Sequence, residues 1–391
     1  MAEKRAHDEP EVPMHRQSKA ARFNAHTLKR LHAAVKDNPE IDLATQMPLG
    51  YSNRLIDMRS VVQHSLERTK KTPQKEFIPE EDIRESLSAI DPVEVRFPLS
   101  HAVLELLKEV SKTADPLPNG LGQRICQALQ RSEVIWKGAF ARRRMVFKCA
   151  TDIVVKAVRN IDDYTEYTTL QYLERHKPSI PAPKPLGVVS ISGVSLIFMS
   201  YVRSVSLGEV WPTLDCGQKA SLSNQLNTIL LDLRSLPHTQ GTAFGGGVEG
   251  EGCKDIRRHL RRSETPITGL DDFEDFIYSS PHPGGQVFVE LLHRVSPPSY
   301  EHSTPHIVFT HGDLRPDNIV VEMTENNQYS ITGILDWEYS GFYPDYYESV
   351  RCTNCLSPYE DDDWFLYLPE CVSPQCYAHW WLDRVRETRV V

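Results

Sequence analysis

The sequence lacks any run of about eighteen consecutive apolar residues, the length that a membrane-spanning helix requires. Its charged first residues are not followed by the apolar segment of a secretory signal. Positive charge is not in excess either, because the net charge is −9 and the pI is near 5.9. Surfaces for nucleic acid or anionic lipid need clustered Lys and Arg. We therefore expect a cytoplasmic protein that binds neither nucleic acid nor membrane.

Cysteine is also sparse, with eight residues in 391, too few and too scattered for a disulfide-stabilised fold. This scarcity favours a reducing compartment. The spacings Cys352-x2-Cys355 and Cys371-x4-Cys376 admit a structural zinc site, although the second is looser than in a usual zinc knuckle. Free thiols in a mostly buried region are the simpler interpretation.

Four regions differ in composition along the chain. Residues 1–22 mix both charge signs with few large apolar side chains, which predicts a disordered tail. Residues 23–120 carry apolar side chains at helical spacing and predict a helical N-terminal region. Residues 121–202 are rich in β-branched residues between short turns, which predicts an antiparallel sheet, and residues 203–391 are expected to be mainly helical. Strands that precede helices are typical of an α+β fold.

One polar segment, HGDLRPDN at residues 311–318, separates two apolar runs. Pro316 excludes both a regular helix and a central strand, so the segment is expected to be a loop. Asp336 follows the next apolar run downstream. If the two strands are adjacent, Asp313, Asn318 and Asp336 form a cluster of hard oxygen ligands, which suits Mg²⁺. An ordinary polar turn is the alternative.

The segment HGDLRPDN, followed by ILDWE, resembles the catalytic loop and metal-binding segment of the aminoglycoside phosphotransferase and choline kinase superfamily, whose fold is that of protein kinases. DWE stands where protein kinases carry Asp-Phe-Gly. With VWPTL, LLDLRSL and CKDIRRH, the sequence resembles in particular a fungal branch of aminoglycoside-phosphotransferase-like proteins. The likeness extends from about Arg131 to the C-terminus.

This resemblance implies a protein-kinase-like fold with a small antiparallel-sheet N-lobe and hinge over 121–202, a mainly helical C-lobe, and a helical N-terminal extension. It implies an ATP- and Mg²⁺-dependent phosphotransferase that acts on a hydroxyl of a small-molecule acceptor. By resemblance, Asp313 is the catalytic base, His311 braces the loop, and Asn318 and Asp336 hold the metal. The acceptor and the oligomeric state stay open.

Lys156 and Glu166 form a second candidate group. Lys156 lies in DIVVKAV, which reads as a buried strand, and a buried ammonium needs a partner. Glu166 shares one face of the following helix with Leu170 and Leu173, so its carboxylate is expected to point inward. By resemblance this is the kinase ion pair in which the lysine holds the nucleotide phosphates. A lysine that reaches solvent and a surface glutamate are the alternative.

Two further nucleotide contacts follow from the resemblance. The strand LIFMSYV leads into the expected hinge, where backbone groups around Met199 to Tyr201 would receive adenine, although a plain core strand fits equally well. The phosphate-covering loop departs from the kinase pattern, because the hairpin WKGAFARRR offers the single glycine Gly138. Arg142 to Arg144 can contact phosphates, but solvated charges are expected there.

Two other functions remain open from the sequence. The missing glycines are compatible with a catalytically silent kinase-like binding module. A protein kinase is disfavoured because WEYSGFYPDYYE after Asp336 has no activation-loop spacing. Gly312 also replaces the arginine that senses a phosphorylated activation loop in protein kinases, so that control is not expected.

Acids beside aromatic residues, among them Asp345 and Glu348, are expected to receive a cationic acceptor or to be solvated.

Overall fold

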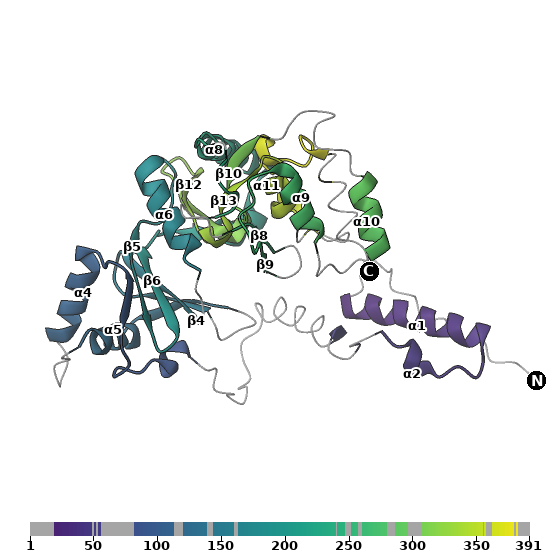
Figure 1. Ribbon diagram of the computed structural model, residues 1–391, viewed down its shortest axis with the longest axis horizontal. Helices are drawn as coiled ribbons and strands as arrows, with labels where there is room; N and C mark the ends of the chain where they lie inside the picture. Colours follow the sequence, from purple (N-terminus) through teal and green to yellow (C-terminus); the bar gives the residue numbers. More distant parts are fainter. Residues whose placement is uncertain are drawn as a thin grey trace, which may run out of the picture. The chain divides into compact units, whose positions relative to one another are not determined.

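The computed structural model describes residues 19–48, 51, 54–55, 82–112, 120–138, 144–159, 163–239, 241–246, 252–256, 260–279, 286–295, 306–354, 356, 362–378 and 381. The chain divides into two compact units, Met1–Pro79 and Glu80–Val391. Within the first unit, the structure describes helices α1 (Lys19–Asp37) and α2 (Leu43–Gln46). They are the helical N-terminal extension that the sequence predicted (Figure 1).

The unit boundary at Pro79 lies within residues 23–120, for which the sequence predicted a helical region. Strand β1 (Glu94–Phe97) joins the sheet of the second unit, and residues Ile83–Ser86 form a 3-10 turn, η3. Strand β1 was not predicted because EVRF is an edge strand of only four residues, two of which are charged, so its apolar alternation is too short to stand out. Of the tail expected over 1–22, residues 1–18 lie outside the described part, and α1 includes the last four.

The N-lobe is built on a six-stranded sheet with the order β1-β5-β6-β4-β3-β2. All neighbouring strands run antiparallel, as the sequence predicted. The remaining strands are β2 (Glu133–Lys137), β3 (Arg144–Lys148), β4 (Ile153–Arg159), β5 (Pro185–Ile191) and β6 (Val194–Ser200). The lobe also contains helices α4 (His101–Lys112), α5 (Leu121–Gln130) and α6 (Thr165–His176).

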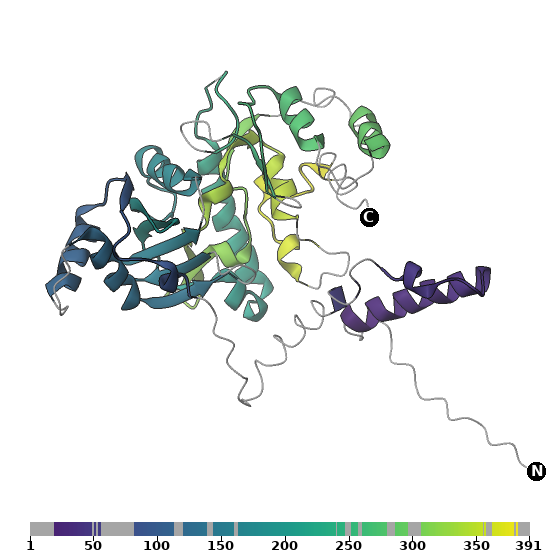
Figure 2. The same cartoon turned by 60° about the horizontal axis from the view of Figure 1, so that its bottom comes forward.

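The two faces of this sheet have different neighbours, as Figures 1 and 2 show. Side chains alternate between the faces along β4. Val155 and Ala157 pack in one core with residues of α4 and α5. Val154 packs on the opposite face with Tyr167 of α6. Lys156 has the parity of Val154, so the strand period directs it toward α6.

The C-lobe contains most of the helices of the second unit, together with short strands. The helices are α7 (Leu207–Val210), α8 (Cys216–Arg234), α9 (Leu270–Tyr278), α10 (Gln286–Val295) and α11 (Tyr347–Cys352). The strands are β7 (Val205–Ser206), β8 (Lys254–Asp255), β9 (Arg261–Arg262), β10 (Ile307–Thr310), β11 (Ile319–Met323), β12 (Tyr329–Ile334) and β13 (Gly341–Pro344). The 3-10 turns are η4 (Trp211–Thr213), η5 (Pro316–Asn318), η6 (Trp337–Tyr339), η7 (Asp363–Leu366) and η8 (Glu370–Val372).

Two strand pairs bring separated segments of the C-lobe together. Strands β11 and β12 are antiparallel, with Ile319 opposite Ile334. Strands β10 and β13 are also antiparallel, with Thr310 opposite Gly341. Residues 311–318 and 335–340 connect these strands and therefore lie side by side. The polar loop and the segment that contains Asp336 thus share one region of the fold.

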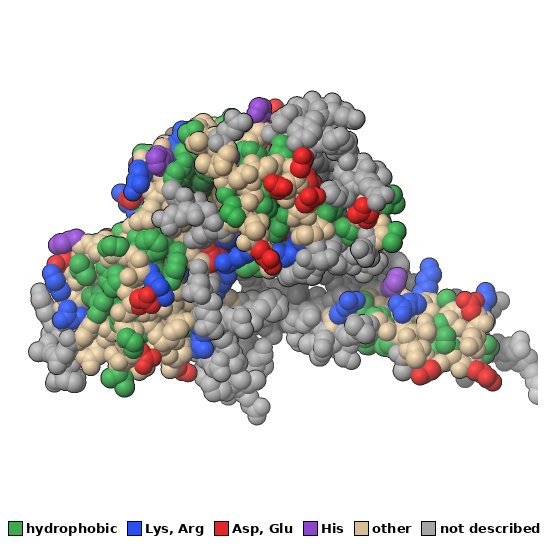
Figure 3. Space-filling view, in the orientation of Figure 1, with side chains coloured by type: hydrophobic (Ala, Val, Ile, Leu, Met, Phe, Trp, Pro, Cys, Tyr) green, Lys and Arg blue, Asp and Glu red, His purple; other side chains and the backbone are tan. Residues whose placement is uncertain are grey.

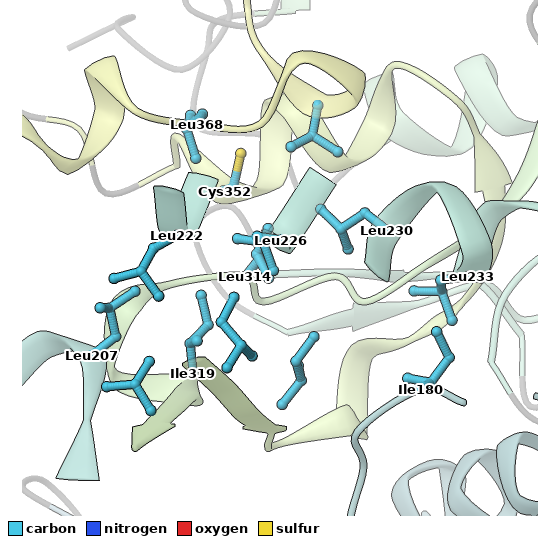
Figure 4. Close-up of a cluster of buried hydrophobic side chains, with 14 of the residues drawn as sticks. Ile180, Leu207, Leu222, Leu226, Leu230, Leu233, Leu314, Ile319, Cys352 and Leu368 are labelled. Atoms are coloured by element: carbon cyan, nitrogen blue, oxygen red, sulfur yellow. The ribbon is translucent and has the colours of Figure 1, made fainter. Parts of the chain in front are cut away.

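A buried apolar core supports the polar loop from below. Helix α8 begins with a capping box between Asp215 and Gln218 and buries one leucine face. Figure 4 shows that Leu226 of this face lies beside Leu314 of the loop. Leu314 is buried, so it anchors the loop between its polar residues. The anchor limits the movement of Asp313, the neighbouring residue.

On the face drawn in Figure 3, acidic side chains gather over α9, whose sequence includes the exposed residues Asp271, Asp272 and Asp275. Within the described ranges, no helix is long and apolar enough to cross a membrane.

Candidate active site

The backbone at Gly312 determines the shape of the polar loop. Gly312 has φ +82°, in the left-handed region that favours glycine. A Cβ atom at this position would lie 2.2 Å from the carbonyl oxygen of Tyr339. The loop therefore passes against η6 at a distance that leaves no room for a side chain. This explains why an arginine cannot stand here.

His311 connects the loop to the segment before Asp336. The Asp313 N–H donates to Nδ1 of His311 at 3.2 Å, and Nε2 of His311 lies 3.0 Å from the Leu335 carbonyl oxygen. These partners fit the tautomer that carries its proton on Nε2, because Nδ1 must accept. The ring is buried and packs edge-on against Trp337, with centroids 4.6 Å apart. His311 thus has the geometry of a residue that braces the loop.

Glu348 of α11 holds the same loop from the other side. Its carboxylate accepts the N–H groups of His311 at 2.6 Å and of Gly312 at 3.1 Å. Arg351 of the same helix donates from Nε to the Gly312 carbonyl oxygen at 2.9 Å. Glu348 is 1% exposed, so its carboxylate is not available to receive a cationic acceptor. The structure corrects that expectation and gives Glu348 a supporting role.

Asp313 and Asn318 contact each other across the loop. The Asn318 side-chain amide donates from Nδ2 to the Asp313 carbonyl oxygen at 2.8 Å and to Asp313 Oδ2 at 3.1 Å. Leu335 N–H donates to the Asn318 carbonyl oxygen at 2.8 Å, which places Asn318 beside the residue that precedes Asp336. Asn318 is buried, whereas the Asp313 side chain is 22% exposed. Asp313 is therefore the member of the pair that solvent and small molecules can reach.

The Lys156 ammonium joins the N-lobe to the C-lobe. Its Nζ lies 2.7 Å from Oε2 of Glu166 on α6 and forms an ion pair with Asp336. Glu338 Oε2 follows at 3.6 Å. The structure thus contains the Lys156–Glu166 pair that the sequence predicted, with both side chains buried. The same lysine contacts the segment beside the polar loop.

Burial and charge oppose each other in this group. Burial raises the pKa of Glu166 to about 7, although Lys156 acts in the other direction. For Asp336, burial is outweighed by the charge and hydrogen bond of Lys156, which hold the pKa of this carboxyl below its usual range. Burial also disfavours the charged form of Lys156, but Asp336, Glu166 and Glu338 together keep the pKa of Lys156 well above its ordinary value.

Three carboxylates converge around this lysine. Ligand oxygens of Glu166, Asp336 and Glu338 lie within 4.8 Å of one another, and within the described ranges they form the sole such group. The Lys156 ammonium pairs with all three carboxylates. Of these residues, Asp336 follows Leu335, whose N–H donates to the Asn318 carbonyl oxygen, and the side-chain oxygens of Asp336 and Asn318 are of the kind that Mg²⁺ prefers. Asp336 has φ +68° and ψ +57°, a left-handed conformation that is uncommon for a residue with a side chain. Such conformations cluster at functional sites.

Arg144 belongs to the site, although the sequence favoured a solvated charge at this position. Its Nη1 lies 2.5 Å from Oε1 of Glu338, and its side chain is 32% exposed. Burial disfavours its charge, but Glu338 outweighs burial and raises the pKa of Arg144. The expectation of a solvated charge is therefore corrected for Arg144. Arg142 lies outside the described residues.

The segment expected to bind adenine follows β6 into the hinge. Met199 is buried in the sheet, between Val154 of β4 and Pro185 of β5. Tyr201 N–H donates to the Asp152 carbonyl oxygen at 2.8 Å. This N–H group already has an acceptor, so the predicted contact of Tyr201 with adenine is restricted to its carbonyl group.

Comparison with models of protein families gives a match that includes the residues of this site. The sequence model described as the phosphotransferase enzyme family matches residues 142–367, more than half of the 391 residues. The chain belongs to the phosphotransferase enzyme family. The match includes Lys156, Glu166, Asp313, Asn318 and Asp336. No curated protein matched the chain, and the fungal branch stays a prediction.

Solved aminoglycoside phosphotransferases are similar to this phosphotransferase at low identity. The gentamicin complex of APH(2")-IIa is 12% identical and covers 74% of this chain and 96% of its own, with a TM-score of 0.41. The enzyme APH(3'')-Id from Streptomyces rimosus is 13% identical over 66% of this chain and 92% of its own, with a TM-score of 0.40. With scores this low, the assignment rests on the family match and on the order of strands and helices described above.

The cysteines of this phosphotransferase do not form a metal site among the described residues. Cys355 lies outside them, and no described cysteine belongs to a group of possible metal ligands. Burial raises the pKa of Cys371 to about 11 and raises that of Cys352 well above its ordinary value. Free thiols stay the simpler interpretation of these residues.

Proposed function

We propose that this protein transfers the γ-phosphoryl group of ATP, in the presence of Mg²⁺, to a hydroxyl group of a small molecule. The observation that supports this most strongly is the Lys156 ammonium. It contacts Glu166 of the N-lobe and Asp336 of the C-lobe, next to the loop with Asp313 and Asn318. Phosphoryl transfer needs mainly positioning and charge neutralisation, and this cluster offers both.

Asn318 and Asp336 are the proposed metal ligands. The Asn318 amide group directs its NH₂ toward Asp313, which leaves the amide oxygen as its ligand atom. Asp336 contributes a carboxylate whose ionised form is favoured, as the lowered pKa of its carboxyl shows. Bound Mg²⁺ would supply neutralisation of phosphate charge. Lys156 is the proposed phosphate-binding cation, and Glu166 orients its ammonium.

Asp313 is the proposed catalytic base. Its carboxylate is held by Asn318, while part of the side chain remains accessible. It would accept a hydrogen bond from the acceptor hydroxyl and take its proton as the new oxygen–phosphorus bond forms. His311 and Glu348 fix the backbone on which this carboxylate is placed. Carbonyl groups around Met199 and Tyr201 are the proposed contacts of adenine.

The acceptor can be identified by a screen of ATP consumption over amino alcohols, sugars, aminoglycosides and other hydroxylated metabolites. The Asp313→Asn variant serves as the blank, because it keeps the shape of the loop and removes the base. We expect at least one class of acceptor to increase ADP formation by the wild type alone. Equal ADP formation by the two proteins with every acceptor would contradict the proposed roles.

A catalytically silent binding module is the second candidate, favoured by the single glycine, Gly138, in the first hairpin. A thermal shift with ATP separates the candidates cheaply. Ligand at about 100 times its Kd stabilises a protein by roughly 2.7 kcal/mol. We expect a rise in Tm with millimolar ATP and Mg²⁺, and a smaller one when EDTA removes the metal. A Tm that millimolar nucleotide leaves unchanged would favour the silent module.

A further inference from the structure

Lys254 of β8 carries an ammonium that is enclosed completely within the protein. Its side chain is 0% exposed. The Nζ atom lies 2.7 Å from Asp163 Oδ2, 2.6 Å from Thr165 Oγ1 and 2.8 Å from the Glu338 carbonyl oxygen. An ammonium has three protons, and each has an acceptor here. A charge buried in this way persists only when its partners are held in place.

The partners of Lys254 belong to two different elements of the site. Thr165 is the first residue of α6, and Asp163 accepts its N–H at 3.1 Å just before the helix begins. Glu338 belongs to η6, directly after Asp336 and Trp337. Lys254 therefore ties the first turn of α6 to the segment that carries the proposed metal ligand. Glu166, the partner of Lys156, is the next residue after Thr165.

Two other contacts hold the same face of α6. Thr169 Oγ1 lies 2.8 Å from Ser340 Oγ, one turn further along the helix. A Cβ atom at Gly246 would lie 2.3 Å from Thr165 Cγ2 and 2.6 Å from the Ser340 carbonyl oxygen, so the backbone at Gly246 closes the space beside the helix. The beginning of α6 is thus packed directly on η6. Lys254 supplies a buried charged contact of this interface, and Arg262 Nη2 also pairs with Asp163 Oδ2 at 2.6 Å.

We propose that Lys254 is a positioning residue, which fixes the start of α6 so that Glu166 keeps Lys156 oriented toward the nucleotide phosphates. The inference rests on the proposed function, since it assigns Lys156 to phosphate binding. Lys254 acts through Thr165 and the helix. A misplacement of about 1 Å in such a site can reduce the rate on the order of 100-fold.

The test is a double-mutant cycle on ATP–Mg²⁺ affinity, measured by isothermal titration calorimetry. Lys254→Met keeps a long unbranched side chain and removes the charge. Glu166→Gln removes the carboxylate through which Lys254 would act. We expect Lys254→Met alone to weaken ATP–Mg²⁺ binding at least about tenfold. In the Glu166→Gln background the same substitution should change affinity by less than about twofold, because residues that act through one contact are not additive. An equal loss in both backgrounds would overturn the proposal.

Lys219 of α8 provides a matched control. It is also a largely enclosed lysine in an ion pair, with Nζ 2.8 Å from Asp363 Oδ2 and a side chain that is 12% exposed. Lys219→Met should lower Tm without a change in ATP–Mg²⁺ affinity. If Lys219→Met weakened ATP–Mg²⁺ binding as much as Lys254→Met, general destabilisation would explain both, and the positioning role would be refuted.

If Lys254→Met does not fold, a second variant measured without nucleotide tests the proposal. Thr165→Val has nearly the same shape and removes one of the three acceptors of the ammonium. In the nucleotide-free protein we expect Thr165→Val to accelerate hydrogen–deuterium exchange across α6, whereas exchange of α8 stays as in the wild type. Unchanged exchange of α6 would overturn the proposal. A wild type that does not bind ATP–Mg²⁺ would refute the proposed function, and the exchange experiment would still decide whether Lys254 fixes α6.

Discussion

Asp336 combines an unusual backbone conformation with a buried charge. Its φ of +68° lies in the left-handed region, which Asp and Asn tolerate better than other residues with a side chain. Its carboxylate pairs with Lys156. A substitution that tests the charge alone must therefore introduce a residue that also tolerates the left-handed backbone conformation. Asn satisfies this requirement, whereas Ala changes both properties.

Asp336→Asn is expected to fold and to lose the Mg²⁺ dependence of ATP binding, because an amide is a weaker metal ligand than a carboxylate. Calorimetric titration of ATP with Mg²⁺ and with EDTA measures the effect, and circular dichroism monitors folding. The control is Asp317→Asn, an exposed acid of η5 in the polar loop. Its ATP affinity should equal that of the wild type. Mg²⁺-dependent binding retained by Asp336→Asn would argue against the metal assignment.

Gly312→Ala tests how tightly the loop is placed against η6. The new Cβ would lie 2.2 Å from the Tyr339 carbonyl oxygen, at a residue with positive φ. Strain and overpacking together should lower the free energy of unfolding by about 2–5 kcal/mol. Urea denaturation gives this number. Gly120→Ala is the control, since nothing lies within 4 Å of a Cβ atom there, and a similar loss in both variants would exclude the steric explanation.

The elements of the site differ in how far the sequence could predict them. Lys156 and Glu166 were predictable because strand alternation and helical spacing both direct their side chains inward. Asp313 and Asn318 were predictable because Pro316 marks a loop between strands. Glu348 and Lys254 were not, because their partners lie 36 or more residues away in the chain, and no local period shows that such charges are buried. Local sequence patterns predict whether a side chain points inward, whereas tertiary packing determines which residue it contacts.

Helix α11 supports the loop through Glu348, whose carboxylate accepts two backbone N–H groups. Glu348→Gln removes the negative charge and one acceptor oxygen, and it places an NH₂ donor beside the buried N–H donors of the loop. The free energy of unfolding should fall by about 1–3 kcal/mol. Urea denaturation at pH 7 measures this loss, with Glu322→Gln at an exposed position of β11 as the control. Equal stability of the Glu348 variant and wild type would show that the carboxylate does not hold the loop.

The chain divides into two compact units, whereas its composition indicated four regions. All proposed catalytic, metal-binding and nucleotide-binding residues lie in the unit Glu80–Val391. The sequence placed the start of the main domain near residue 121, because strand β1 has only four residues, two of them charged. The hydrophobic core shared by α4, α5 and the sheet makes residues 82–130 part of the N-lobe.

A chain that begins at Glu80 should therefore fold and bind ATP–Mg²⁺ like the full-length protein. We expect affinities that agree within about twofold, since no proposed contact is removed. Calorimetric titration of the two proteins decides the point. Binding that requires residues 1–79 would show that the first unit contributes to the nucleotide site.

The central claim is that Asp313 acts as the base in phosphoryl transfer from ATP. The most direct test compares ADP formation by wild type and Asp313→Asn with saturating ATP–Mg²⁺ and the best acceptor from the screen. We predict a loss of turnover on the order of 10²- to 10⁴-fold, the usual contribution of a general base, with ATP affinity unchanged. Turnover by Asp313→Asn equal to that of the wild type would contradict the account.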